Sequence, residues 1–123
     1  MKILTPRMHG YLDFVVVAAF ALAPTLFGFS PVPARISWAL AVVHLLLTLS
    51  TAFPMGIIKL VPFTVHGAIE LIVVIALVAM PWLFSFAGEP VARNFFLAFA
   101  VIIFLVWLVT DYKAAEEPSV ARA

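Results

Sequence analysis

The chain has 123 residues, of which 66% are apolar and 11% are charged, and its formal net charge is +1. Soluble domains are about half apolar and about one quarter charged, so this composition excludes a soluble domain and predicts a protein that lies in the lipid bilayer. The absence of cysteine excludes disulfide bonds, thiolate metal sites and thiol catalysis, and without a basic stripe we expect no nucleic-acid partner.

Four apolar segments follow one another along the chain, and each is long enough to cross a bilayer as a helix. They cover residues 11–29, 36–53, 68–86 and 95–110. Continuous apolar runs are helical, because only helices or closed barrels satisfy their backbone groups in lipid. Prolines and glycines interrupt the runs. The sequence therefore predicts an all-α polytopic membrane protein, with four transmembrane helices in one domain of residues 1–123.

The first segment begins with Thr5 and Pro6, which is typical of a helix N-cap followed by proline in the first turn. Its basic start and the Ala-Leu-Ala at 21–23 are also typical of a cleaved signal peptide. The acidic residue Asp13 inside the apolar run, and the similarity of this segment to the third one, favour a retained helix instead.

The chain contains an internal repeat in which His9 corresponds to His66. In this register the two copies are identical at positions 9, 10, 16, 17, 19, 24, 26, 27 and 29 of the first copy. The repeating unit is a helical hairpin, covering about residues 5–53 and 62–112, followed by a tail of residues 113–123. Each unit crosses the membrane twice, so both insert the same way up, and we expect a parallel repeat with a pseudo-twofold axis along the membrane normal.

The positions of the lysines and arginines predict the orientation in the membrane. Two of these residues, Arg35 and Arg93, fall on one side, and five fall on the other: Lys2, Arg7, Lys59, Lys113 and Arg122. By the positive-inside rule, both termini are expected to be cytoplasmic.

The hairpin pattern resembles the SPW repeat family of small bacterial membrane proteins. Each hairpin has a His-Gly-x-x-acid start, and a proline follows near the end of its first helix, in Ala23-Pro24-Thr25 and Met80-Pro81-Trp82. In that family a Ser-Pro-Trp tripeptide defines each two-helix repeat, and the serine is missing from both copies here. The resemblance implies a bacterial inner-membrane protein of two repeats, and it implies no activity.

The repeated motif also contains the strongest candidate site. His9 and Asp13, and likewise His66 and Glu70, are four positions apart, so each pair shares one helix face. The symmetry places both pairs at one depth near the cytoplasmic surface, where the carboxylates are expected to reach cytoplasmic water.

Three interpretations of these residues stay open. The pairs lock two helices together, with Gly10 and Gly67 allowing close backbone approach. Alternatively, the histidines bind a cofactor, either haem or a divalent metal, with Asp13 and Glu70 as orienting acids or ligands. The third interpretation is proton or ion transport, in which ionisable groups inside the membrane often take part.

A second polar site is expected on the second helix, where Ser37, His44, Thr48 and Thr51 share one face. In the register that pairs His9 with His66, the corresponding positions are largely apolar: 94, 101, 105 and 108. His44 is therefore expected to form an interhelical hydrogen bond or to act as a relay or ligand. About 13 Å of helix separates it from the inner end, which makes it a poor haem partner for His9.

The chain contains none of the phosphate-loop, dinucleotide or nucleophile-elbow motifs of enzymes, so no enzymatic activity is expected. The sequence favours a structural or accessory membrane component with a His/acid cluster near the cytoplasmic face. The alternatives are a haem- or divalent-metal-binding membrane protein and a small oligomeric ion or proton transporter or channel. Expected partners are the bilayer and either a second copy or another membrane protein. The last helix is expected to end at 111–113, before a solvated tail.

Overall fold

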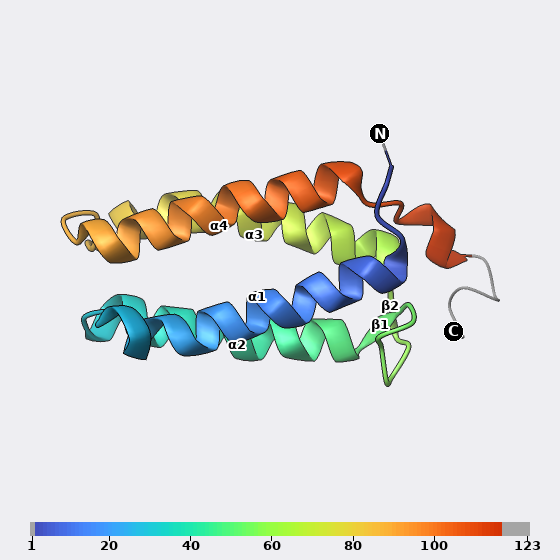
Figure 1. Ribbon diagram of the computed structural model, residues 1–123, viewed down its shortest axis with the longest axis horizontal. Coiled ribbons are helices and arrows are strands. Elements are labelled where there is room, and N and C mark those ends of the chain that lie inside the picture. Colours follow the sequence, from blue (N-terminus) through green and yellow to red (C-terminus); the bar gives the residue numbers. More distant parts are fainter. Residues whose placement is uncertain (1, 117–123) are drawn as a thin grey trace.

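The computed structural model describes residues 2–116, which form two antiparallel helical hairpins side by side (Figure 1). Each of the four long helices is apolar enough to cross a membrane: α1 (Pro6–Phe27), α2 (Pro31–Leu49), α3 (Phe63–Leu83) and α4 (Pro90–Val109). The helix α1 packs along α2, and α3 packs along α4. At 1.5 Å per residue each helix is about 30 Å long, which matches the hydrocarbon thickness of a bilayer. The prediction of a four-helix membrane protein is therefore confirmed.

The two ends of the bundle differ. One end, which we call the turn end, holds the two connections within the hairpins (Figure 1). The other, which we call the terminal end, holds the N-terminal segment and the connection between the hairpins. Three short elements lie there: β1 (Thr51–Ala52), β2 (Val61–Pro62) and the 3-10 helix η1 (Lys113–Glu116).

The helices begin earlier than the apolar runs, because proline starts three of them without loss of a backbone hydrogen bond. At the first helix, the side chain of Thr5 accepts a hydrogen bond from the Met8 backbone N–H at 3.2 Å, as expected for an N-cap. The prediction that the last helix runs to residues 111–113 is wrong. It ends at Val109, and the chain then turns back across the terminal end of the bundle.

Short parallel pairings show how the hairpins are joined at the terminal end. Leu4, before the first hairpin, pairs with Thr110, which ends the second hairpin. In the same way Val61, before the second hairpin, pairs with Thr51, which ends the first. Each hairpin is thus held by the segment that leads into the other.

These pairings correct the repeat register for the second helix of each hairpin. Leu4 and Val61 correspond in the register that pairs His9 with His66, but Thr51 and Thr110 lie two positions further apart. The prolines that start α2 and α4, Pro31 and Pro90, follow this second register, because the turn before α4 is longer. The comparison of the second helix with positions 94, 101, 105 and 108 was therefore out of register.

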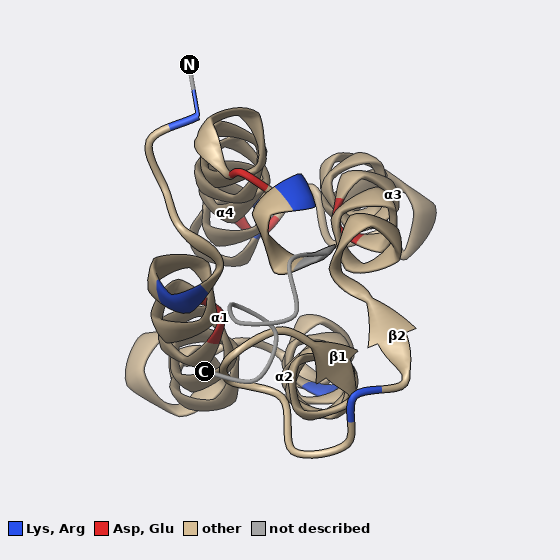
Figure 2. Ribbon diagram, turned by 90° about the vertical axis from the view of Figure 1, so that its right-hand side faces the viewer, with Lys and Arg blue, Asp and Glu red and all other residues tan. Residues whose placement is uncertain are grey.

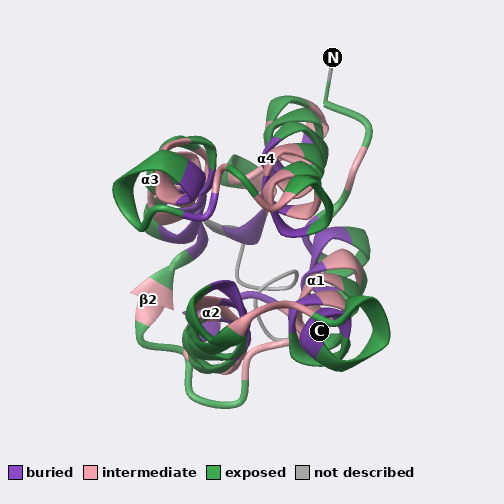
Figure 3. Ribbon diagram, turned by 90° about the vertical axis from the view of Figure 1, so that its left-hand side faces the viewer, coloured by how far each residue is buried: buried purple, intermediate pink, exposed green. Residues whose placement is uncertain are grey.

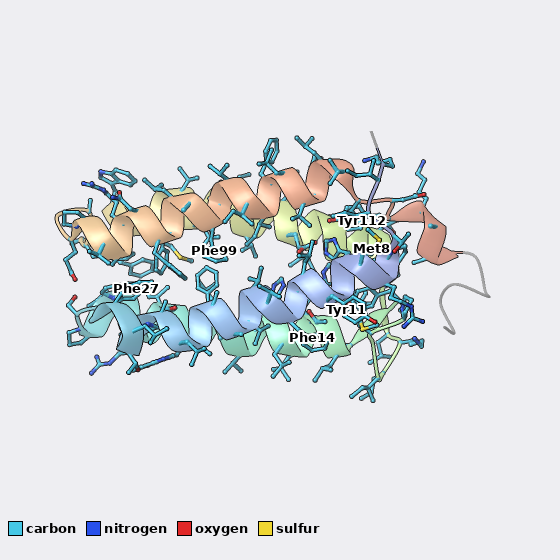
Figure 4. The ribbon with its side chains drawn as sticks, viewed as in Figure 1. Met8, Tyr11, Phe14, Phe27, Phe99 and Tyr112 are labelled. Carbon is cyan, nitrogen blue, oxygen red and sulfur yellow. The ribbon has the colours of Figure 1, made fainter. Side chains whose placement is uncertain are left out.

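Aromatic packing fills the centre of the bundle between the hairpins. Phe20 of α1 lies edge-on to three rings of α4, at centroid distances of 5.0–6.0 Å: Phe95, Phe96 and Phe99. Figure 4 shows Phe99 between the two hairpins. The outer faces of all four helices carry exposed apolar side chains, as expected for surfaces in contact with lipid (Figure 3).

Candidate metal centre

Two histidines and two carboxylates meet between α1 and α3 near the terminal end. His9 Nε2 lies 3.2 Å from Asp13 Oδ1 and 2.9 Å from Glu70 Oε1. His66 Nε2 lies 3.3 Å from Asp13 Oδ2 and 3.4 Å from Glu70 Oε1. Each imidazole therefore faces the acid of its own helix and the acid of the other helix. We call these four residues the His/acid cluster.

The helices position the cluster through two simple features of the sequence. Both histidines are the fourth residue of their helix, and each acid follows one turn later. Because side chains at i and i+4 share a face, the near-twofold relation of α1 and α3 points both pairs at one centre. One potential ligand atom from each of the four side chains lies within 4.8 Å of every other.

The tautomer of each histidine follows from a threonine on the opposite hairpin. The Thr51 hydroxyl donates to the Leu47 carbonyl at 2.6 Å, so its oxygen accepts a hydrogen bond from the His66 Nδ1–H at 2.8 Å. Thr110 likewise donates to the Val106 carbonyl at 2.6 Å and lies 2.9 Å from His9 Nδ1. A hydroxyl has one proton, so both Nδ1 atoms carry hydrogen.

In the neutral ring the other nitrogen, Nε2, then carries a lone pair that faces carboxylate oxygens. Among the described residues, Nε2 of His9, Nε2 of His66 and Oδ2 of Asp13 are buried without a partner in hydrogen-bond geometry. Lone pairs this close repel each other unless a proton or a cation lies between them. The cluster is built to hold positive charge at its centre.

Two further side chains contact the acids, one from each hairpin. His44 Nε2 of α2 lies 3.1 Å from Asp13 Oδ1. The Tyr112 hydroxyl donates to Glu70 Oε1 at 2.9 Å. Burial, and next the negative charge of Glu70, raise the pKa of the Tyr112 hydroxyl far above its usual value, so it stays a donor. Figure 4 shows Tyr112 at the terminal end.

An aromatic cap separates the cluster from the terminal end. Its rings are Phe53, Phe63 and Tyr112, with Phe63 stacked on Phe53 at 4.8 Å and lying 5.1 Å from the His9 ring. The expectation that the carboxylates reach cytoplasmic water is wrong, because Asp13 and Glu70 are each only 2% exposed.

The two glycines of the motif make room for this cap rather than for a neighbouring helix backbone. A Cβ at Gly10 would overlap the Met55 side chain, and one at Gly67 would lie 2.9 Å from the Tyr112 ring. The expected backbone approach is therefore replaced by side chains that fold in from the connecting segments.

The polar face predicted on the second helix divides into two parts. His44 and Thr51 join the cluster through Asp13 and His66. Ser37 donates to the Phe20 carbonyl at 2.6 Å, and the Thr48 hydroxyl is buried without a hydrogen-bond partner among the described residues. These last two side chains stay outside the cluster.

Sequence reasoning missed Thr110 and Tyr112. Both follow the last apolar run, where no periodicity shows that the chain turns back onto the bundle. The register that pairs Pro31 with Pro90 also pairs Thr51 with Thr110, and it was the available signal for the second threonine. The two hydroxyls make the same contacts.

Comparisons with known proteins add no relative to this description: no family model matches the chain, and no curated protein or solved structure matches it.

Proposed function

We propose that this membrane protein binds one divalent first-row transition-metal ion, with His9, Asp13, His66 and Glu70 as its ligands. One observation carries the proposal: two buried Nε2 lone pairs, fixed by threonine hydroxyls, face two carboxylates without hydrogen-bond geometry. A divalent ion and two carboxylates also sum to zero net charge, which suits a site inside a membrane helix pair.

The distances fit a four-coordinate ion. Zn–N and Zn–O bonds of about 2.0–2.2 Å place tetrahedral ligand atoms about 3.3–3.5 Å apart, and the four His–acid contacts measure 2.9–3.4 Å. Imidazole and carboxylate ligands suit zinc, iron, nickel and manganese rather than soft Cu(I). The threonine contacts supply the partner that metal-bound histidines require at the other ring nitrogen.

The same contacts favour a single ion over haem. In a bis-histidine haem the macrocycle occupies the plane between the two axial nitrogens. Here Asp13 and Glu70 occupy the space between His9 and His66, whose ring centroids are 5.5 Å apart.

A second candidate function is a helix lock held by protons. Two imidazolium rings and two carboxylates also sum to zero charge, and the contacts from His9 to Glu70 and from His66 to Asp13 join the two hairpins. In that case the cluster only stabilises the bundle, and the protein is the structural or accessory membrane component that the sequence favours.

Equilibrium dialysis against zinc distinguishes these functions. We expect the parent chain in detergent to retain one zinc per chain after removal of excess metal, and the double variant His9→Leu with His66→Leu to retain none. Thr48→Val is the matched control, because Thr48 is buried nearby without contacting the cluster. A metal-free parent chain, with iron and manganese tested alongside zinc, would identify the cluster as a helix lock.

We propose that the terminal end faces the cytoplasm of a bacterial inner membrane. Lys2, Arg7, Lys59 and Lys113 lie at that end (Figure 2), and Arg35 and Arg93 start the helices at the turn end. Arg122 and the tail beyond residue 116 lie outside the described residues. Membership of the SPW repeat family remains a proposal supported by the hairpin motifs, as does assembly with a second copy or another membrane protein. Ion flux in liposomes is the test of transport.

A further inference from the structure

A crevice of about 160 Å³ lies between α1 and α4 at the depth of the His/acid cluster. Its inner lining includes the two carboxylate residues, Asp13 and Glu70. Its outer lining includes Val15 and Ile102, which are 60% and 44% exposed on the faces that contact lipid. The crevice therefore leads from the hydrocarbon region of the bilayer toward the cluster, whereas the aromatic cap covers the cluster from the terminal end.

The polarity of the lining restricts what enters. Apart from the two acids, the lining is apolar, with Leu12, Phe99 and Val106 among its side chains. Asp13 Oδ2 is buried and has no hydrogen-bond partner among the described residues. A buried acceptor of this kind is costly unless a donor or a cation reaches it. The crevice suits a molecule that dissolves in lipid and carries one hydroxyl group.

The volume indicates the size of the group. An apolar cavity of about 150 Å³ holds one benzene molecule, so the crevice is large enough for one six-membered ring. A longer apolar substituent on the ring would remain in the bilayer, because the outer lining is exposed there.

We propose that the crevice binds the hydroxylated aromatic ring of a lipid-soluble molecule, with its hydroxyl group directed at Asp13 and Glu70. This proposal deepens the proposed metal function, since the hydroxyl oxygen then lies beside the ion as a further ligand. The ring and the apolar lining account for affinity, and the hydroxyl contact accounts for selectivity.

Equilibrium binding of radiolabelled 4-butylphenol to the zinc-treated protein in nanodiscs tests the proposal, with binding to empty nanodiscs subtracted. The matched probe is 4-butylanisole, which has the same ring and tail but no hydroxyl donor. We expect one saturable phenol site per chain and at least about tenfold weaker binding of the anisole, as expected when a buried acceptor loses its donor.

Variants on both walls locate the site. Leu12→Phe on α1 and Val106→Phe on α4 fill the crevice and should each weaken phenol binding at least about tenfold, a loss of about 1.4 kcal/mol. Leu105→Phe, on the lipid face of α4 and outside the crevice, is the control. Zinc content should be equal in all three variants and in the parent chain.

The failure of this proposal differs from the failure of the metal proposal. Absence of a saturable phenol site, equal binding of the anisole, or unchanged binding in both wall variants would overturn the crevice proposal, whatever the zinc content. A metal-free parent chain that still binds the phenol at this site would overturn only the metal function, because the carboxylates accept a hydrogen bond from the hydroxyl without an ion.

Discussion

The two hairpins build the same frame around the cluster and complete it with different residues. Each hairpin supplies a histidine and an acid, and each supplies the threonine that orients the other hairpin's histidine. The outer partners of the acids break this symmetry. Asp13 contacts His44, whose counterpart in the register of the two threonines is Ile103, whereas Glu70 contacts Tyr112.

The difference shows which contacts define the centre and which ones tune it. The contacts that occur twice are those that a bound ion needs, namely four ligand side chains and two hydroxyls that fix ring tautomers. The contacts that occur once give the acids different surroundings. Asp13 lies beside a third imidazole, and Glu70 lies beside a hydroxyl that stays protonated.

Removal of both repeated histidines is expected to have the largest effect. The double variant His9→Leu with His66→Leu should lose zinc binding in dialysis. It should also destabilise the fold by about 3–5 kcal/mol, because two carboxylates remain buried without a cation. Thermal unfolding in detergent measures the second effect. Full zinc binding by this variant would contradict the assignment of both histidines as ligands.

The two threonines should have equal, intermediate effects. Thr51→Val and Thr110→Val each remove the acceptor for one Nδ1–H, and loss of such a partner weakens metal affinity about 10–100-fold. Competition with a chromogenic zinc chelator measures both affinities. The frame would prove asymmetric if one substitution weakened binding strongly and the other left it unchanged.

Variants that make the hairpins alike at the outer partners are expected to have smaller effects. His44→Ile copies Ile103 into the first hairpin, and Tyr112→Phe copies Phe53 into the second, since both pairs correspond in the register of the two threonines. Loss of the Tyr112 hydroxyl removes one hydrogen bond to a carboxylate, worth about 1.5–3 kcal/mol in stability. We expect each variant to keep one zinc per chain. Complete loss of zinc would move the residue into the ligand set.

Exchange of the acids should have the smallest effect. Asp13→Glu combined with Glu70→Asp keeps two carboxylates between the same two imidazoles, so zinc affinity should change less than in either threonine variant. The chelator competition used for the threonine variants measures it. Loss as severe as that of the double histidine variant would show that the acids are not interchangeable.

The sequence predicted the helices and the pairing of the motifs for clear physical reasons. Long apolar runs leave few choices of structure in lipid, and the repeat placed His9 and His66 at one depth. Their cluster with the acids is confirmed, and its ligand stays a prediction. The segments outside the helices could not be predicted in this way. Tyr112 and Phe53 fold over the cluster from connections that have no periodic pattern.

The position of His44 shows a second limit of sequence reasoning. Rise along a helix gave a distance to the far end of the segment, but α2 ends at Leu49 rather than at Phe53. Asp13 lies one turn deeper than His9, so His44 reaches the acid without reaching the first imidazole's depth. Depth along one helix does not include the reach of side chains from its neighbour.

X-ray absorption spectroscopy of the zinc-loaded protein tests the metal centre most directly. The metal proposal predicts a first shell of nitrogen and oxygen atoms at about 2.0–2.2 Å, with the outer-shell pattern of two imidazoles. That pattern should disappear in the double histidine variant. A spectrum without imidazole scattering, or one identical in parent and variant, would contradict a metal centre between α1 and α3.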